Sequence, residues 1–260
     1  MIRKSFKILQ LLMHIVYGIG VITYHTVFKK RPANDPTFKA AFTVWYKQAC
    51  KIVDLKIIVQ GEPAEGPVLM VANHISWLDI LLLASVANPR FLSKAEIRKW
   101  PLVGWAGQQI DTLFIKRGQR SASAAASAGI AEGLAQGNRI LIFPEGTTAE
   151  GKVVGRLHAR LFGAAIETNS PVQPIVIHYT DDNDDSHTSE RIPFVGEQNL
   201  FSNVWLLLGC KNPTAYVYCL PTRDSAGQTR KALVSDIHEA MQSTLERSQQ
   251  AQLNNTQKTA

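Results

Sequence analysis

Between residues 56 and 220 the chain alternates short apolar runs with longer stretches of helical pattern, and this alternation constrains the fold more than any other feature. Short apolar runs bounded by turn residues predict buried strands. The predicted strands are residues 56–60, 68–72, 90–92, 111–115, 139–143, 172–178 and 215–220. The predicted helices are residues 78–86, 121–136, 157–168 and 224–249. Helices placed between strands favour an α/β fold, in which a mostly parallel sheet is covered by helices.

An apolar segment at residues 8–28 precedes this region and has almost the length needed to cross a bilayer. Cations flank the segment on both sides, and no acidic residue occurs before Asp35. The flanking cations are Arg3, Lys4, Lys7, Lys29, Lys30 and Arg31. Much of the net charge of +7 therefore lies where an anionic lipid surface would attract it. The basic composition indicates membrane lipids as partners, and it does not indicate nucleic acid.

The sequence leaves the orientation of this apolar segment open. Lys29 follows it where a signal peptide would carry small residues for cleavage, so we expect an uncleaved N-terminus. Positive charge on both flanks gives no asymmetry from which to orient a span. A helix that crosses the bilayer and a helix that lies in one leaflet both agree with the pattern.

The chain is expected to divide into three parts. After a break at residues 32–36, residues 37–55 predict a second helix, which either packs on the core or lies at the membrane interface. We expect an N-terminal membrane-associated helical segment at residues 1–55 and a catalytic α/β domain at 56–249. The polar residues 250–260 predict a disordered tail.

The residue types that bind metals do not form a recognisable site. Cys50, Cys210 and Cys219 are widely spaced and lack the pairing of a zinc site or a disulfide framework. The acidic run at residues 181–185 lacks the glycine and the final glutamate of a calcium-binding loop. We therefore expect no metal and no cofactor, and reduced, structural thiols.

A histidine and an aspartate follow the strand predicted at residues 68–72. His74 leaves the carboxyl end of that strand, where open α/β sheets place their ligands. Asp79 comes five residues later, after a turn that could bring its carboxylate to the imidazole. Such a pair fixes the tautomer of the histidine and stabilises the imidazolium that forms when it accepts a proton. An alcohol that attacks a carbonyl needs a base of this kind.

Three further segments carry candidate binding residues. The strand predicted at residues 111–115 ends in Lys116 and Arg117, which could hold a phosphate. The strand at residues 139–143 runs into Pro144-Glu145-Gly146-Thr147, a tight turn that could bring backbone N–H groups to a ligand. The strand at residues 172–178 carries Pro174 near its start, and a simple core strand explains most of that pattern.

Taken in order, these segments resemble the glycerolipid acyltransferase family, which includes bacterial lysophosphatidate acyltransferases. The resemblance rests on a His-x4-Asp block at His74, a Phe-Ile-x-Arg block ending at Arg117, a Phe-Pro-Glu-Gly-Thr block ending at Thr147 and the proline at Pro174. Lys94 is similar to the lysine that commonly follows the first block. The resemblance covers roughly residues 61–179, and the order and spacing of four blocks make it specific.

The resemblance implies a role for each matching residue. His74 would deprotonate the acceptor hydroxyl, and Asp79 would orient it. Lys116 and Arg117 would hold the acceptor phosphate, while Glu145, Gly146 and Thr147 would shape the acceptor site. The implied reaction moves a fatty acyl group from acyl-CoA or acyl carrier protein to lysophosphatidate, giving phosphatidate, without a covalent acyl-enzyme.

Two departures from the family pattern affect the acceptor. Family members that use lysophosphatidate often have arginine where this chain has Thr148, and a Phe–basic pair where it has Leu157 and His158. Another lysolipid acceptor, such as lyso-ornithine lipid, therefore stays open, as does a catalytically silent lipid-binding membrane protein. The expected location is a bacterial inner membrane, with the active site facing the cytoplasm.

Overall fold

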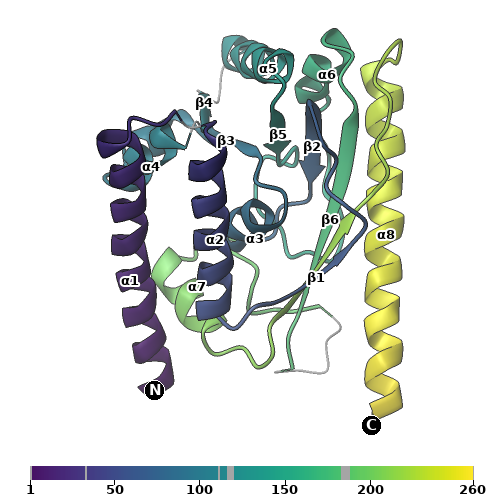
Figure 1. The fold of residues 1–260 in the computed structure, drawn as a ribbon. Coiled ribbons are helices and arrows are strands. Elements are labelled where there is room, and N and C mark those ends of the chain that lie inside the picture. The colour runs from purple at the N-terminus through teal and green to yellow at the C-terminus, as the bar shows by residue number, and fades with distance from the viewer. Residues whose placement is uncertain (1, 33, 111, 116–119, 183–187, 260) are drawn as a thin grey trace.

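The computed structural model describes residues 2–32, 34–110, 112–115, 120–182 and 188–259. Its centre is a seven-stranded sheet with the order β1-β7-β6-β2-β5-β3-β4 (Figure 1). The strands are β1 (Lys56–Gln60), β2 (Val68–Ala72), β3 (Arg90–Lys94), β4 (Leu113–Ile115), β5 (Arg139–Ile142), β6 (Val172–Thr180) and β7 (Thr214–Cys219). All neighbouring strands run parallel except β6 and β7. The predicted α/β fold class is confirmed.

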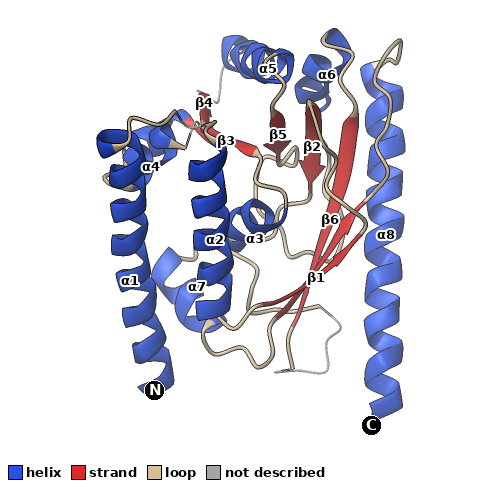
Figure 2. Ribbon diagram, in the orientation of Figure 1, coloured by secondary structure: helices blue, strands red, loops and turns tan. Residues whose placement is uncertain are grey.

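Helices cover both faces of the sheet (Figure 2). The side chains of β2 show why, because Val68 and Met70 enter one apolar core and Leu69 and Val71 enter the other. A strand buried on both faces has no polar alternation, as expected in a parallel sheet. The helices are α1 (Ile2–Thr23), α2 (Pro36–Ile52), α3 (Leu78–Val86), α4 (Val103–Gln109), α5 (Arg120–Ala135), α6 (Gly163–Glu167), α7 (Leu200–Leu207) and α8 (Arg230–Thr259).

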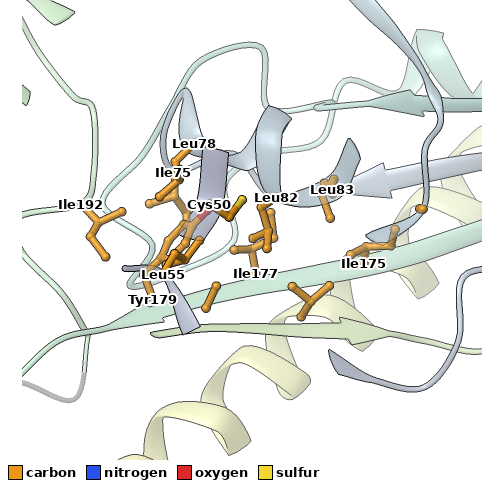
Figure 3. Packing of buried hydrophobic residues seen from close by; sticks show 14 of the residues in the cluster. Cys50, Leu55, Ile75, Leu78, Leu82, Leu83, Ile175, Ile177, Tyr179 and Ile192 are labelled. Carbon is orange, nitrogen blue, oxygen red and sulfur yellow. The ribbon is translucent and has the colours of Figure 1, made fainter. Parts of the chain in front are cut away.

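The first core lies on the sheet face that α2, α3 and α7 cover. It gathers Cys50 from the end of α2, Leu82 and Leu83 from α3, and Ile177 from β6. Figure 3 shows Tyr179 within this core, beside Leu55 and Ile75. All three cysteines of the chain are free and buried. The second core joins α5, α6 and α8 to the opposite face.

The N-terminal apolar segment forms α1, which continues as one π-helical turn at Tyr24–Phe28. α1 lies alongside α2 (Figure 1). His14 and Trp45 stack with ring centroids 4.7 Å apart, and each ring N–H donates to the other residue's backbone carbonyl at 2.9 Å. Asp35 caps α2 by accepting from the backbone N–H of Phe38 at 3.0 Å. The apolar face of α2 packs on the core, which favours the first of the two interpretations of this helix.

Several elements differ from the sequence prediction. α4 and α7 were not predicted, and residues 157–168 form a 3-10 turn (Ala159–Phe162) followed by the short helix α6. Residues 250–259 continue α8 instead of forming the predicted disordered tail. Residues 230–260 contain neither glycine nor proline, so nothing in the sequence interrupts the helix.

Candidate active site

The site lies where β2 ends and α3 begins. His74 follows β2 by two residues, and Asp79 lies in the first turn of α3. The imidazole Nδ1 of His74 and Oδ2 of Asp79 are 2.8 Å apart. The Asp79 side chain is completely buried, whereas 19% of the His74 side chain is exposed. The predicted pairing of these two residues is thus present in the structure, with the histidine on the solvent side.

The Asp79 carboxylate is held by four donors. Besides His74, Oδ2 accepts from the backbone N–H groups of Ile75 at 2.7 Å and Ser76 at 3.0 Å. Oδ1 accepts from the Tyr179 hydroxyl at 2.8 Å. Four donors satisfy the oxygens of this buried carboxylate and fix its position. Asp79 can therefore hold Nδ1–H of His74 in one tautomer.

Tyr179 is a residue of the site that the sequence analysis missed. It lies near the carboxyl end of β6, the strand beside β2, and it is fully buried. Burial raises the pKa of Tyr179 well above its ordinary value, and the charge of Asp79 raises it further. The hydroxyl is therefore a permanent donor to Asp79. A tyrosine at the end of a buried strand is common in any core, so its sequence position carried no signal.

Stacking also fixes the orientation of the His74 ring. The ring lies on Phe143, which directly follows β5, with centroids 4.0 Å apart and an interplanar angle of 16°. Nδ1 faces Asp79, so the tautomer with a proton on Nδ1 leaves Nε2 as the basic nitrogen. Nε2 has no hydrogen-bond partner among the described residues. The ring is arranged to take a proton from a group that approaches Nε2.

The turn after β5 borders the same histidine. Gly146 adopts φ +78° and donates its N–H to the Phe143 carbonyl at 3.2 Å, which closes the turn. Two residues past Thr147, the Ala149 N–H donates to the His74 backbone carbonyl at 2.8 Å. Residue 149, just past the turn, is therefore hydrogen-bonded to the loop that carries His74. A positive φ explains why glycine occupies position 146.

Glu145 is the third ionisable group of the site. Burial raises the pKa of Glu145 to about 7, while the backbone N–H of Gly155 and the nearby His74 act in the opposite direction. Its Oε1 is buried and has no hydrogen-bond partner in the described structure. A buried, unpartnered carboxyl oxygen beside the base is suited to bind a polar group of a ligand.

The other predicted site residues lie on β3, on the turn and beyond the described residues. Lys94 ends β3, opposite Ile115 of β4. Thr147 is exposed at the turn, and Thr148 donates its hydroxyl to the Phe194 carbonyl. Lys116 and Arg117 lie outside the described residues. Of the predicted site residues that the structure describes, it brings together His74, Asp79 and the turn.

Within the described residues, no three His, Cys, Asp or Glu side chains group closely enough to hold a metal ion. Three residues of the acidic run, at positions 183–185, lie outside the described ranges.

The chain is similar to known acyltransferases in sequence and in fold. The Acyltransferase family model matches residues 56–178. A lyso-ornithine lipid O-acyltransferase from Pseudomonas aeruginosa is 34% identical over 246 residues, which cover 94% of each chain. A 1-acyl-sn-glycerol-3-phosphate acyltransferase from Neisseria gonorrhoeae is 32% identical and covers 76% of this chain and 78% of its own. The crystal structure of the acyltransferase PlsC from Thermotoga maritima has a TM-score of 0.62, at 22% identity and with 93% and 97% coverage, and so shares the fold.

Proposed function

The chain belongs to the glycerolipid acyltransferase family and modifies lysolipids, and from that premise we propose that it transfers a fatty acyl group to the hydroxyl of lyso-ornithine lipid. The acyl donor in this proposal is a thioester of coenzyme A or of acyl carrier protein. The observation that carries the reaction is the pairing of His74 with the buried Asp79.

The proposed chemistry follows from that pairing. The acceptor hydroxyl gives its proton to Nε2 of His74 as its oxygen attacks the thioester carbonyl. Asp79 stabilises the imidazolium, because its charge lies against Nδ1–H. When the tetrahedral intermediate collapses, the carbon–sulfur bond breaks and the thiolate takes the proton from the imidazolium. The products are an ester and a free thiol, and no residue of the chain becomes acylated.

Thr148 supports the choice of lyso-ornithine lipid as acceptor. The hydroxyl of Thr148 is bonded to the Phe194 carbonyl, so this position supplies neither a cation nor a free donor to a headgroup. A phosphomonoester would benefit from a permanent cation beside this turn. The relative that matches 94% of this chain is named for the lyso-ornithine lipid reaction. Lysophosphatidate is the second candidate, favoured by Lys116 and Arg117 in the sequence and by the Neisseria gonorrhoeae relative.

We also propose that residues 1–55 hold the catalytic domain at a bacterial inner membrane, with the site facing the cytoplasm. In the described part of the chain, Ile2–Phe28 is the one helix long and apolar enough to cross a membrane. Large apolar side chains of this helix are exposed: Ile2, Phe6, Leu9, Leu12, Met13, Ile15, Val16, Tyr17, Tyr24, Val27 and Phe28.

The contacts of α1 favour a helix that lies in the membrane surface over one that crosses it. Arg3 and Lys7 both pair with Asp54, which follows α2. Lys4 donates to the Trp205 carbonyl of α7 at 2.9 Å. Arg3 and Lys7 thus fasten the start of α1 to the end of α2, and Lys4 fastens it to α7 of the catalytic domain. A helix fastened along a domain, with its outer face apolar, is suited to the interface of one leaflet.

Acyl transfer in detergent tests the proposal. Purified protein would receive labelled acyl-CoA or acyl carrier protein, with lyso-ornithine lipid or lysophosphatidate as acceptor. We expect transfer to lyso-ornithine lipid by the wild type and by a His238→Ala control. His238 lies on α8, and its ring makes a hydrogen bond to the Val154 backbone carbonyl instead of contacting the His74–Asp79 pair. His74→Ala should be inactive. Equal product from the wild type and His74→Ala, on every donor and acceptor, would refute the catalytic assignment and leave a lipid-binding protein.

A further inference from the structure

A segment distant from the catalytic pair in sequence packs against the turn that follows β5. The backbone N–H of His158 donates to the Pro144 carbonyl at 2.9 Å. A Cβ atom built on Gly155 would lie 3.2 Å from Oε2 of Glu145, so this glycine packs directly against that carboxyl. The neighbouring Leu157 is buried in the second core and anchors the segment. Residues 155–158 therefore form a fixed second wall beside the turn.

The imidazole of His158 lies over Gly146. A Cβ atom built on Gly146 would meet Cδ2 and Nε2 of the His158 ring at 3.3 Å each. The His158 residue is exposed, and no described residue makes a hydrogen bond or ion pair with its ring. Both ring nitrogens are thus available to a ligand that enters beside the turn.

The position of His74 makes this ring a neighbour of the acceptor. The turn lies beside His74, because Phe143 stacks on the His74 ring and the Ala149 N–H donates a hydrogen bond to the His74 backbone carbonyl. An acceptor hydroxyl bound at Nε2 of His74 therefore has the turn and the buried Glu145 carboxyl beside it. The Thr148 hydroxyl is engaged by the Phe194 carbonyl. Among the described residues, His158 places ring nitrogens over this turn.

We propose that His158 contacts the headgroup of the acceptor and sets the preference among lysolipids. An imidazole can donate to a carbonyl or carboxylate oxygen, such as that of an amino-acid headgroup, without the permanent charge that favours a phosphomonoester. Arginine or lysine at the same place would supply that charge. This inference rests on the proposed function, since it names the residue that selects the acceptor of that reaction.

Kinetics of His158→Arg and His158→Ala on both acceptors test the inference. His158→Arg should move the ratio of kcat/KM toward lysophosphatidate by about tenfold or more, because it adds a bidentate cation at the headgroup. His158→Ala should raise KM for lyso-ornithine lipid by about fivefold or more with little change in kcat, because the lost contact binds the substrate and does not act in the chemical step. Lys152→Ala is the matched control, since this exposed lysine pairs with Glu150 and Glu190.

The outcomes separate this inference from the proposed function. If both His158 variants keep the wild-type KM and acceptor ratio within about twofold, as Lys152→Ala should, His158 does not select the acceptor although the enzyme is active. If the wild type acylates neither acceptor, the proposed function fails and the inference falls with it. Thermal melting of each variant shows whether it is folded. If the larger arginine side chain disturbs the turn, the kinetics of His158→Ala alone decide whether His158 contacts the acceptor.

Discussion

Replacing Asp79 by asparagine tests the charge of this carboxylate separately from its position. His74 Nδ1 and the backbone N–H groups of Ile75 and Ser76 all donate to Oδ2. Because three donors face this atom, an introduced amide must place its oxygen there. Its NH₂ group then meets the Tyr179 hydroxyl, which can rotate to accept a hydrogen bond. The variant should therefore keep the fold and the tautomer of His74 and lose only the negative charge.

The size of the effect follows from the distance between the two charges. Imidazolium and carboxylate whose charge centres are about 4 Å apart interact by about 4 kcal/mol at an effective dielectric constant of about 20. This interaction exists only once His74 has taken the proton, so its loss falls on the transition state. A barrier higher by about 4 kcal/mol lowers kcat by about 10³-fold.

Single-turnover rates of acyl transfer, with the enzyme in excess over the labelled acyl donor, would measure this loss directly. Asp236→Asn is the matched control, because Asp236 forms an exposed ion pair with Arg223 and is remote from His74. The control should retain the wild-type rate. A loss of less than about tenfold in a folded Asp79→Asn variant would refute the argument that Asp79 stabilises an imidazolium.

Three further substitutions have outcomes that the structure predicts. Tyr179→Phe removes a hydrogen bond to a buried charge and should lower the free energy of unfolding by about 1.5–3 kcal/mol in a denaturant titration, more than the part-buried Tyr216→Phe control; equal stabilities of the two variants would make Tyr179 an ordinary core residue. Glu145 has its pKa raised to about 7 from 4.5, so the folded chain binds a proton that the unfolded chain releases. The melting temperature of the wild type should therefore decline as the pH rises from about 4.5 to 7. A Glu145→Gln variant whose melting temperature declines in parallel over the same range would contradict this. Gly146→Ala forces alanine to φ +78° and should lower the free energy of unfolding by about 1–2 kcal/mol in a denaturant titration. The control Gly129→Ala on α5 should not, because a Cβ atom there would meet no atom within 4 Å. Equal stabilities of the two variants would argue against strain at the turn.

Much of the fold could be predicted from its central strands, because strands such as β2 are buried on both faces. β1 and β2 begin and end at the predicted residues, since each is a short apolar run between turn residues. α7 was missed because Leu200–Leu207 is short and apolar, so its pattern does not distinguish a helix from a loop. Its cap shows only in the structure, where Asn199 accepts from the Ser202 N–H.

The site could be predicted for the His74–Asp79 pair and, through the family resemblance, for the turn at residues 144–147. His74 and Asp79 are five residues apart, so one turn brings them together. Tyr179 and His158 reach the site from distant segments through the pairing of β6 with β2 and the bond from His158 to Pro144. Such contacts depend on the order of the strands, which a single sequence does not encode locally.

The place of β1 in the sheet has a consequence for how the chain is made. β1 lies at one edge, and its partner is β7, with Lys56 opposite Thr214. During synthesis β1 therefore leaves the ribosome long before its partner is translated, and pairing across such a separation is slow. α1 and α2 precede it and are available first. On the proposed membrane association, the growing chain meets lipid through α1 while its sheet is still open, so the catalytic domain completes its folding at the surface from which it takes its substrate.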